Sequence, residues 1–206
     1  MPDITLLAVF LPTFFFVSIT PGMCMTLAMT LGMSIGVRRT MWMMLGELVG
    51  VALVAIAAVM GVASIMLNYP QAFAILKWFG GAYLVYIGIN MWRSKGKMAL
   101  VEGQSTPTVS NLELITQGFT TAIANPKGWA FMVSLLPPFI DIEKSVAPQM
   151  VALLSIIMFT EFSSMMAYAA GGKSLRVFLS RGDNIKWMNR IAGGLMIGVG
   201  GWLALG

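Results

Sequence analysis

Two short segments of the chain could together hold a negatively charged group: Thr20-Pro21-Gly22 and Asn125-Pro126-Lys127. Thr and Asn often precede the first residue of a helix, and proline fits the first helical position because its missing N–H has no partner there. Each segment therefore predicts the end of one helix and the start of another. A helix start exposes unpaired N–H groups and the positive end of the helix dipole, and Lys127 adds a full positive charge. An anion such as a carboxylate suits both segments together.

Both segments interrupt apolar sequence that is long enough to enter a lipid bilayer. No charged residue occurs between Asp3 and Arg38 or between Glu47 and Lys77, and each gap exceeds the roughly 20 residues that span a bilayer. At that depth, a broken helix persists only where it is buried in protein or lines a cavity. Two breaks in corresponding halves of a chain are typical of a transporter's substrate site. The alternative is a pair of proline kinks that only shape the helix bundle.

Glu47 and Glu161 are further candidates for chemistry, because both fall inside apolar segments. A carboxylate there is costly, so it is paired, protonated or in contact with a water-filled cavity. The functional interpretation is proton coupling or capture of a substrate ammonium, with Glu161 favoured. The alternative is an internal ion pair with Lys127 that orients the helices. Glu47 also lies about two turns, roughly 12 Å, from Arg39, so it could instead reach the cytoplasmic interface.

Cys24 is the one cysteine of the chain, and histidine is absent. A single thiol cannot form an internal disulfide, and without histidine the commonest metal ligand and general base are missing. The run Met23-Cys24-Met25, with Met29 nearby, could hold Cu(I), which prefers soft sulfur. Methionine also fills apolar helices without binding metal. We therefore expect no cofactor, no bound metal and no enzymatic activity.

The composition predicts an integral membrane protein in contact with a lipid bilayer. The 206 residues are 58% hydrophobic and only 10% charged, whereas about a quarter of a soluble chain is charged. The N-terminal apolar stretch is too long for a cleaved signal peptide and carries Asp3 in place of a basic region. The net charge of +5 is scattered among loops, so no nucleic-acid partner is expected.

Apolar windows between charges and turns predict an all-α polytopic membrane protein with six transmembrane helices. The first and fourth helices are broken, at Pro21 and Pro126. A polar stretch divides the chain into a first three-helix repeat (1–92), a cytoplasmic linker (93–111) and a second three-helix repeat (112–206). The six helices are predicted over residues 6–35, 41–67, 72–92, 112–139, 148–171 and 185–205.

The two halves resemble each other in sequence. Residues 77–81 and 190–194 each place a basic residue three positions before a Gly-Gly pair, and Gly88 and Gly201 follow at the same offset. A phenylalanine also precedes both key prolines by seven residues. A tandem three-helix unit inserts in opposite orientations, because an odd number of crossings ends on the other side of the membrane. This predicts an inverted repeat.

Glycines are expected where helices pack closely. Gly32 and Gly36 have small-xxx-small spacing, and the helices predicted over 72–92 and 185–205 are both rich in glycine. For these two helices, packing within the chain and a homodimer seam are both open.

Basic residues gather in alternate loops. The first, third and fifth predicted loops hold nine of them, the second loop (68–71) holds none, and the fourth mixes Asp141, Glu143 and Lys144. Loops rich in Lys and Arg stay in the cytoplasm. Both termini are therefore predicted to be periplasmic.

In motifs that include Thr20-Pro21-Gly22, Asn125-Pro126-Lys127 and Glu161, the chain resembles the lysine-exporter (LysE-type) superfamily. Within it, the chain resembles the branch that exports homoserine, threonine and other neutral amino acids. The resemblance covers the whole chain. It implies six helices, a bacterial inner (cytoplasmic) membrane and amino-acid export driven by the proton gradient. The chain departs from the family pattern at Met23, where a second proline is usual, and at Pro138, where Gln is common. The matching motifs are Ser-x-Thr-Pro-Gly at 18–22, the run from Lys77 to Gly88, Asn125-Pro126-Lys127, Pro137-Pro138-Phe139-Ile140 and Glu161.

Residues and resemblance together predict a secondary transporter that exports small neutral amino acids, threonine-, homoserine- or leucine-like, by proton antiport with alternating access. The alternative is an exporter of metal or other small cations, which would need more intramembrane ligands than Glu47, Glu161 and Cys24. Proton coupling is assigned to Glu161, with Glu47. Substrate binding is assigned to Thr20, Pro21, Gly22, Asn125, Pro126 and Lys127.

Overall fold

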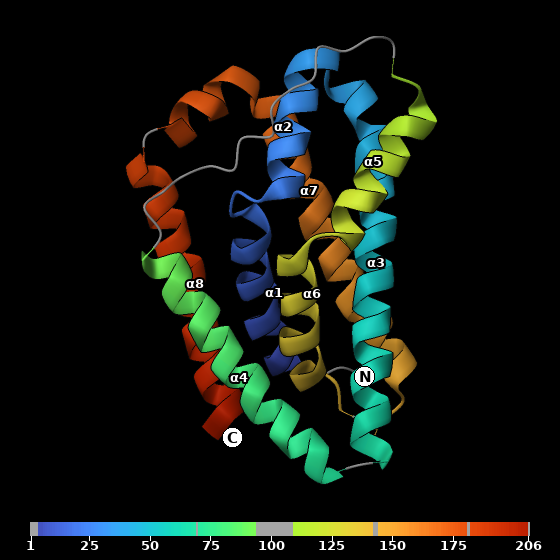
Figure 1. The fold of residues 1–206 in the computed structure, drawn as a ribbon, viewed down its shortest axis with the longest axis vertical. Helices are drawn as coiled ribbons and strands as arrows, with labels where there is room; N and C mark the ends of the chain where they lie inside the picture. The colour runs from blue at the N-terminus through green and yellow to red at the C-terminus, as the bar shows by residue number, and fades with distance from the viewer. Residues whose placement is uncertain (1–3, 69, 94–108, 142–143, 181, 206) are drawn as a thin grey trace.

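The computed structural model describes residues 4–68, 70–93, 109–141, 144–180 and 182–205. Over these residues every regular element is a helix (Figure 1), which confirms the all-α prediction. Most of the predicted linker, residues 94–108, lies outside the described residues. The elements are α1 (Ile4–Ile19), α2 (Met23–Ile35), α3 (Val37–Asn68), α4 (Pro70–Arg93), α5 (Asn111–Ile123), α6 (Pro126–Leu135), the short 3₁₀ helix η1 (Pro137–Phe139), α7 (Val146–Ser180) and α8 (Gly182–Leu205).

Two helices are long and apolar enough to cross a membrane by themselves. They are α3 over Val37–Gly61, with a mean hydropathy of 2.3, and α7 over Val146–Gly172, with a mean hydropathy of 1.7. The pair α1 and α2 is a third candidate, bent by 55° at a short break. Over the described residues, no other helix or bent pair is both long and apolar enough, and α8 begins with several charged residues. The described residues thus contain two membrane-spanning helices of this length and hydropathy, or three spans if the bent pair is counted as one.

Two predicted loops are instead helical. Only Gly36, at φ +82°, separates α2 from α3, so Arg38 lies in the first turn of α3 rather than in a loop. Helix α7 continues past Gly172, at φ +45°, to Ser180. Both glycines adopt a left-handed backbone that residues with a Cβ rarely enter. Gly36 is therefore a hinge, and its predicted role in helix packing is wrong, because nothing lies within 4 Å of where its Cβ would be.

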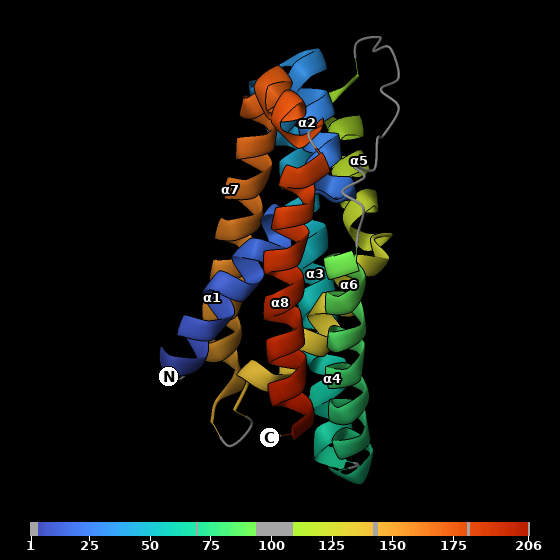
Figure 2. The same cartoon turned by 90° about the vertical axis from the view of Figure 1, so that its left-hand side faces the viewer.

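The other predicted glycine contacts hold along the pair formed by α4 and α8 (Figure 2). A Cβ on Gly193 would lie 2.5 Å from the carbonyl oxygen of Gly88, and one on Gly200 would lie 2.6 Å from that of Gly81. Gly201, in contrast, has open space around it. Gly32 of α2 likewise leaves no room against the backbone of Ala169 in α7. These glycines pack helices within one chain.

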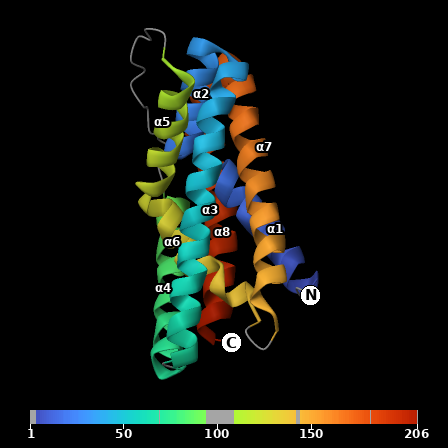
Figure 3. The ribbon, with the colours of Figure 1, turned by 90° about the vertical axis from the view of Figure 1, so that its right-hand side faces the viewer.

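A further glycine seam joins α3 to α5, which lie side by side in Figures 1 and 3. A Cβ on Gly46 would collide with the backbone of Ile115, and one on Gly118 would collide with the backbone of Met43. This seam was not predicted, although Gly46 and Gly50 have the small-xxx-small spacing. It brings the backbone of Glu47 against α5.

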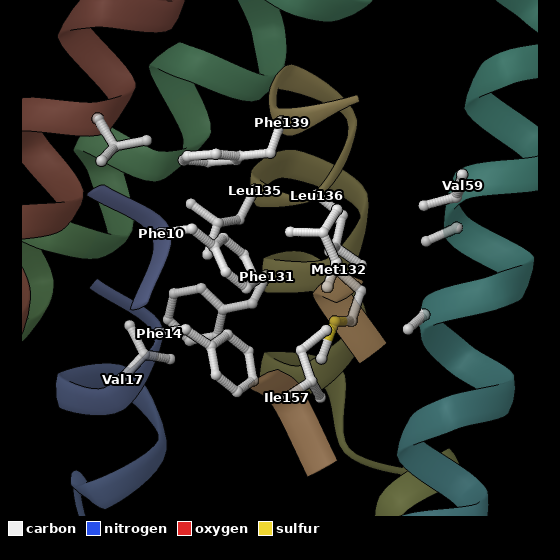
Figure 4. Packing of buried hydrophobic residues seen from close by; sticks show 14 of the residues in the cluster. Phe10, Phe14, Val17, Val59, Phe131, Met132, Leu135, Leu136, Phe139 and Ile157 are labelled. Atoms are coloured by element: carbon white, nitrogen blue, oxygen red, sulfur yellow. The ribbon is translucent and has the colours of Figure 1, made fainter. Parts of the chain in front are cut away.

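Two apolar clusters occupy opposite ends of the bundle. The first is aromatic and lies between α1 and α6 on the side of the chain termini (Figure 4), where Phe10 stacks on Phe14 at 5.5 Å and meets Phe139 edge-on at 5.0 Å. The second is rich in methionine and joins α2, α3 and α7. The helix breaks lie between these clusters.

Candidate functional site

The first break separates α1 from α2. Helix α1 ends at Ile19, and α2 begins only at Met23, with Gly22 as an extended residue before it. The prediction that Thr20 precedes a helix starting at Pro21 is therefore wrong. Pro21 lies inside the break, and the hydroxyl of Thr20 donates backwards to the carbonyl oxygen of Phe16, at 2.6 Å.

The second break separates α5 from α6 and follows the prediction. Asn125 precedes the helix, Pro126 is its first residue, and the Asn125 side chain accepts a hydrogen bond from the backbone N–H of Lys127 at 3.1 Å. The cap is local to three residues, which is why sequence alone sufficed to find it.

At each break, an aromatic side chain donates a hydrogen bond to the backbone carbonyl oxygen at the end of the preceding helix. The hydroxyl of Tyr168 donates to the carbonyl oxygen of Ile19, the last residue of α1, at 2.8 Å. The indole N–H of Trp129 donates to the carbonyl oxygen of Ile123, the last residue of α5, at 2.9 Å. Unpaired backbone groups are very costly at membrane depth. These two hydrogen bonds therefore stabilise the broken helices, because they pair the carbonyl oxygens at the helix ends.

A pocket lies between the two breaks and collects most of the predicted site. All the predicted residues except Pro21 and Pro126 line it, so the prolines shape the breaks without contributing to the pocket wall. Its polar lining consists of Ser18, Thr20, Cys24, Glu47, Asn125, Lys127 and Glu161.

Two contacts bring the breaks together across 100 residues of sequence. The amide nitrogen of Asn125 donates to the sulfur of Cys24 at 3.9 Å. A Cβ on Gly22 would lie 4.0 Å from Lys127 Nζ, so the ammonium group sits against the first break. Lys127 Nζ also lies 5.5 Å from the centre of the Phe131 ring, a favourable cation–π distance. Lys127 thus lies in the first turn after the second break and places its ammonium group against the first break.

The two glutamates enter the pocket from α3 and α7. Glu47 is only 1% exposed, and its Oε2 has no hydrogen-bond partner. Glu47 is therefore buried inside the protein and lines the pocket. Glu161 is half-buried and lies close to Ser18, whose hydroxyl donates to Ser164 at 3.3 Å.

Charges in the pocket interact without forming a closed pair. Lys127 and Glu161 interact electrostatically, as do Glu47 and Glu161. Among the described residues, however, no carboxylate lies within salt-bridge distance of Lys127. The alternative of an internal ion pair that only orients the helices is therefore not what the structure shows. One ammonium and two carboxylates face a shared space.

Comparisons with known proteins identify the family of the chain. The family profile described as LysE type translocator matches residues 15–206, which include both breaks and both glutamates. The chain belongs to the LysE type translocator family. The resemblance seen in the sequence is thereby confirmed.

Several LysE type relatives are similar over most of their length. A homoserine/homoserine lactone efflux protein of Salmonella typhimurium is 27% identical over 187 residues, which are 91% of this chain and 90% of the relative. A leucine efflux protein of Klebsiella pneumoniae is 26% identical over 194 residues, covering 92% and 90%. An uncharacterized membrane protein of Vibrio cholerae is 27% identical over 202 residues, covering 98% of both chains. No solved structure matches the chain significantly.

The chemistry of this LysE type pocket suits a zwitterion better than a metal ion. Its single ammonium and the positive end of the α6 helix dipole favour a carboxylate, while its two carboxylates favour a cation. Among the described residues, no group of three or more Cys, Asp or Glu side chains is placed to hold a metal ion. Of the sulfur residues considered for Cu(I), Met23, Cys24 and Met25 line the pocket, whereas Met29 is buried in the methionine-rich cluster.

Sequence reasoning missed part of the pocket. The apolar lining residues Val17 and Val54 carried no sequence signal beyond their place in apolar helices, whereas Ser18 begins the motif at 18–22 but was given no role. Cys24 was noticed only as a sulfur atom, although its place in the first turn after the break could have indicated a pocket position.

Proposed function

We propose that this LysE type translocator is a secondary transporter that exports small neutral amino acids from the bacterial cytoplasm. The observation that carries the proposal is the single pocket in which Lys127, Glu47 and Glu161 meet between two helix breaks. The substrate carboxylate binds the Lys127 ammonium near the positive end of the α6 helix dipole, and its own ammonium faces the carboxylates. The names of the Salmonella and Klebsiella relatives support amino-acid export.

Proton antiport supplies the energy in this proposal. A neutral zwitterion adds no net charge to a pocket that holds one ammonium and two carboxylates. A proton on Glu161 competes with the substrate ammonium for the same carboxylate, so proton entry and substrate exit alternate at one site. Glu47, with an unpartnered oxygen, is the second proton-binding candidate.

The proposed architecture is six spans in two inverted repeats. Helices α4 and α8 have 24 residues each, enough at about 1.5 Å per residue to cross a core about 30 Å thick. If a two-fold axis relates the halves, α1, α2 and α3 correspond to α5, α6 and α7. The packing is consistent with this correspondence, because α3 packs on α5 as α7 packs on α1, and α3 packs on α6 as α7 packs on α2. Rocking of one repeat against the other would expose the pocket to each side in turn.

We place the protein in the inner membrane with both termini periplasmic. The start of α1 and the end of α8 lie at one end of the bundle in Figures 1 and 2. Arg38 and Lys186, near the starts of α3 and α8, lie toward the other end, which the positive-inside rule assigns to the cytoplasm. The glycines of α4 and α8 pack within the chain, so a homodimer would need another surface.

Efflux from proteoliposomes tests the proposal. Vesicles loaded with radiolabelled leucine, threonine, homoserine or lysine are diluted with and without an imposed pH gradient, and protein-free vesicles serve as the control. We expect efflux of the neutral amino acids that the gradient accelerates, and little efflux of lysine. If no amino acid leaves faster than from empty vesicles, the proposed function is wrong, and transport of metal cations is the next hypothesis to test.

A further inference from the structure

One side of the pocket is apolar. Phe14 and Val17 of α1, Val54 of α3, and Phe131 and Met132 of α6 line it, and each is at most 5% exposed. All five belong to the aromatic cluster on the side of the termini. Figure 4 shows Phe14, Val17 and Phe131 gathered between α1 and α6. The charged residues therefore meet a continuous hydrocarbon wall.

The uncharged polar groups of the pocket already donate to protein partners. The hydroxyl of Thr20 donates to the carbonyl oxygen of Phe16, and that of Ser18 donates to Ser164. The Asn125 side chain accepts from the backbone of Lys127 and donates to Cys24. The five side chains of the apolar wall themselves carry no hydroxyl, amide or charged group that could pair with a hydroxyl on the substrate side chain.

The charged groups are accounted for by the invariant part of an amino acid. Lys127 and the start of α6 take the carboxylate, and a glutamate takes the ammonium. A substrate side chain directed away from these charged groups then contacts the apolar wall. A buried hydroxyl without a hydrogen-bond partner is unfavourable, whereas a methyl group in the same place is favourable.

From this lining we infer that the pocket selects amino acids with apolar side chains, such as valine and leucine, over those whose side chains carry a hydroxyl. The residues that determine this specificity are Val17, Val54 and their neighbours in the wall. The inference rests on the proposed function, because it concerns the same site. It separates this chain's pocket from a homoserine-selective one.

Two pairs of nearly isosteric amino acids test the inference. Valine and threonine differ by a methyl in place of a hydroxyl, and so do norvaline and homoserine. Each is offered in the medium as the counter-substrate that exchanges for labelled leucine in proteoliposomes, and the concentration giving half-maximal exchange is compared within each pair. We expect a preference of about 10- to 100-fold for the apolar member, the range seen for such pairs in apolar pockets. Equal or better use of the hydroxylated member would overturn the inference.

A matched pair of substitutions assigns the selectivity to the wall. Val54 and Val59 both lie on α3 and are 2% and 4% exposed, but only Val54 lines the pocket. Val54→Thr adds a hydroxyl at nearly constant shape. It should reduce the preference for valine over threonine and for norvaline over homoserine several-fold, while Val59→Thr should leave both preferences unchanged. Val17→Thr is the second variant if Val54→Thr does not fold. Unchanged preferences in the folded pocket variants would contradict the assignment.

The outcomes also separate this inference from the proposed function. If no amino acid exchanges at all, the proposed function fails. If neutral amino acids exchange with no difference within either pair, only the inference on specificity fails.

Discussion

At the scale of single residues, the central feature is the pocket that Lys127 shares with Glu47 and Glu161, without a salt bridge between Lys127 and either carboxylate. Losing one member of a buried charge group leaves the others uncompensated, so its removal affects both binding and stability. Lys127 also touches the first break and the Phe131 ring, so its position depends on both halves of the chain.

Removing the charge of Lys127 should therefore weaken substrate binding. A hydrogen bond to a charged group contributes about 1.5–3 kcal/mol, so we expect Lys127→Met to raise the Kd for leucine by about 10- to 100-fold. Lys127→Arg, which keeps the charge, should lose less. Calorimetry in detergent measures the Kd. Lys186→Met is the control, because Lys186 pairs with Asp183 at the surface. An unaltered Kd in Lys127→Met would remove Lys127 from the binding site.

Residues whose role depends on immediate neighbours could be predicted from the sequence. Asn125 and Lys127 are an example, since the cap spans three residues. Thr20 was misjudged, because the chain extends through Pro21 and Gly22 and its hydroxyl turns back to α1 instead. The contact between Asn125 and Cys24 could not be predicted, since it depends on how the two halves pack.

At the scale of elements, an aromatic side chain donates a hydrogen bond to the last carbonyl oxygen of the helix before each break. Tyr168 of α7 serves the end of α1, and Trp129 of α6 serves the end of α5. Because the pocket lies between these breaks, the donors fix its shape as well as the local backbone.

Tyr168→Phe should destabilise the first break. It removes one hydroxyl and leaves the carbonyl of Ile19 without that donor, which costs about 1–3 kcal/mol for a buried group. We expect a lower Tm in detergent together with a weaker affinity for leucine. Tyr83→Phe is the matched control, because Tyr83 is 45% exposed on α4. Equal Tm values for the two variants would show that the bond to Ile19 contributes nothing measurable.

The seam between α4 and α8 should tolerate no added methyl group. A Cβ on Gly193 would lie 2.5 Å from the carbonyl oxygen of Gly88, whereas Gly198 on the same helix has nothing within 4 Å. Overpacking of this kind costs about 1–3 kcal/mol. Gly193→Ala should therefore lower the Tm in detergent, and Gly198→Ala should leave it unchanged or raise it. A Tm drop of the same size in both would argue against this seam.

Helices were predictable where hydropathy and turns are local signals, as for α3 and α7. The bend of 55° between α1 and α2 agrees with the predicted break. The kink at Gly172 and the seam between α3 and α5 were missed, because both are decided by tertiary packing.

At the scale of the whole molecule, hydropathy and turns predict six spans, whereas the described residues contain two helices apolar enough to cross a membrane, or three spans if the bent pair α1 and α2 is counted as one. The number and orientation of the spans in the membrane therefore follow from length, packing and loop charge together.

Reporter fusions test that orientation. With periplasmic termini, alkaline phosphatase fused after Leu205 should be active, and green fluorescent protein at the same place should be dark. Fusions after Arg93, at the end of α4, should give the reverse pattern. An active phosphatase after Arg93 with a fluorescent C-terminus would invert the proposed topology.

The central claim is that amino-acid exit and proton entry alternate at the pocket of Glu161 and Lys127. Its most direct test follows the internal pH of proteoliposomes that are loaded with leucine and diluted into leucine-free medium at equal pH, with the membrane potential clamped. We predict that leucine efflux acidifies the interior in the wild type, and that Glu161→Gln abolishes this acidification while Glu113→Gln, at the exposed start of α5, does not. Leucine efflux by the wild type without any change of internal pH would contradict proton antiport.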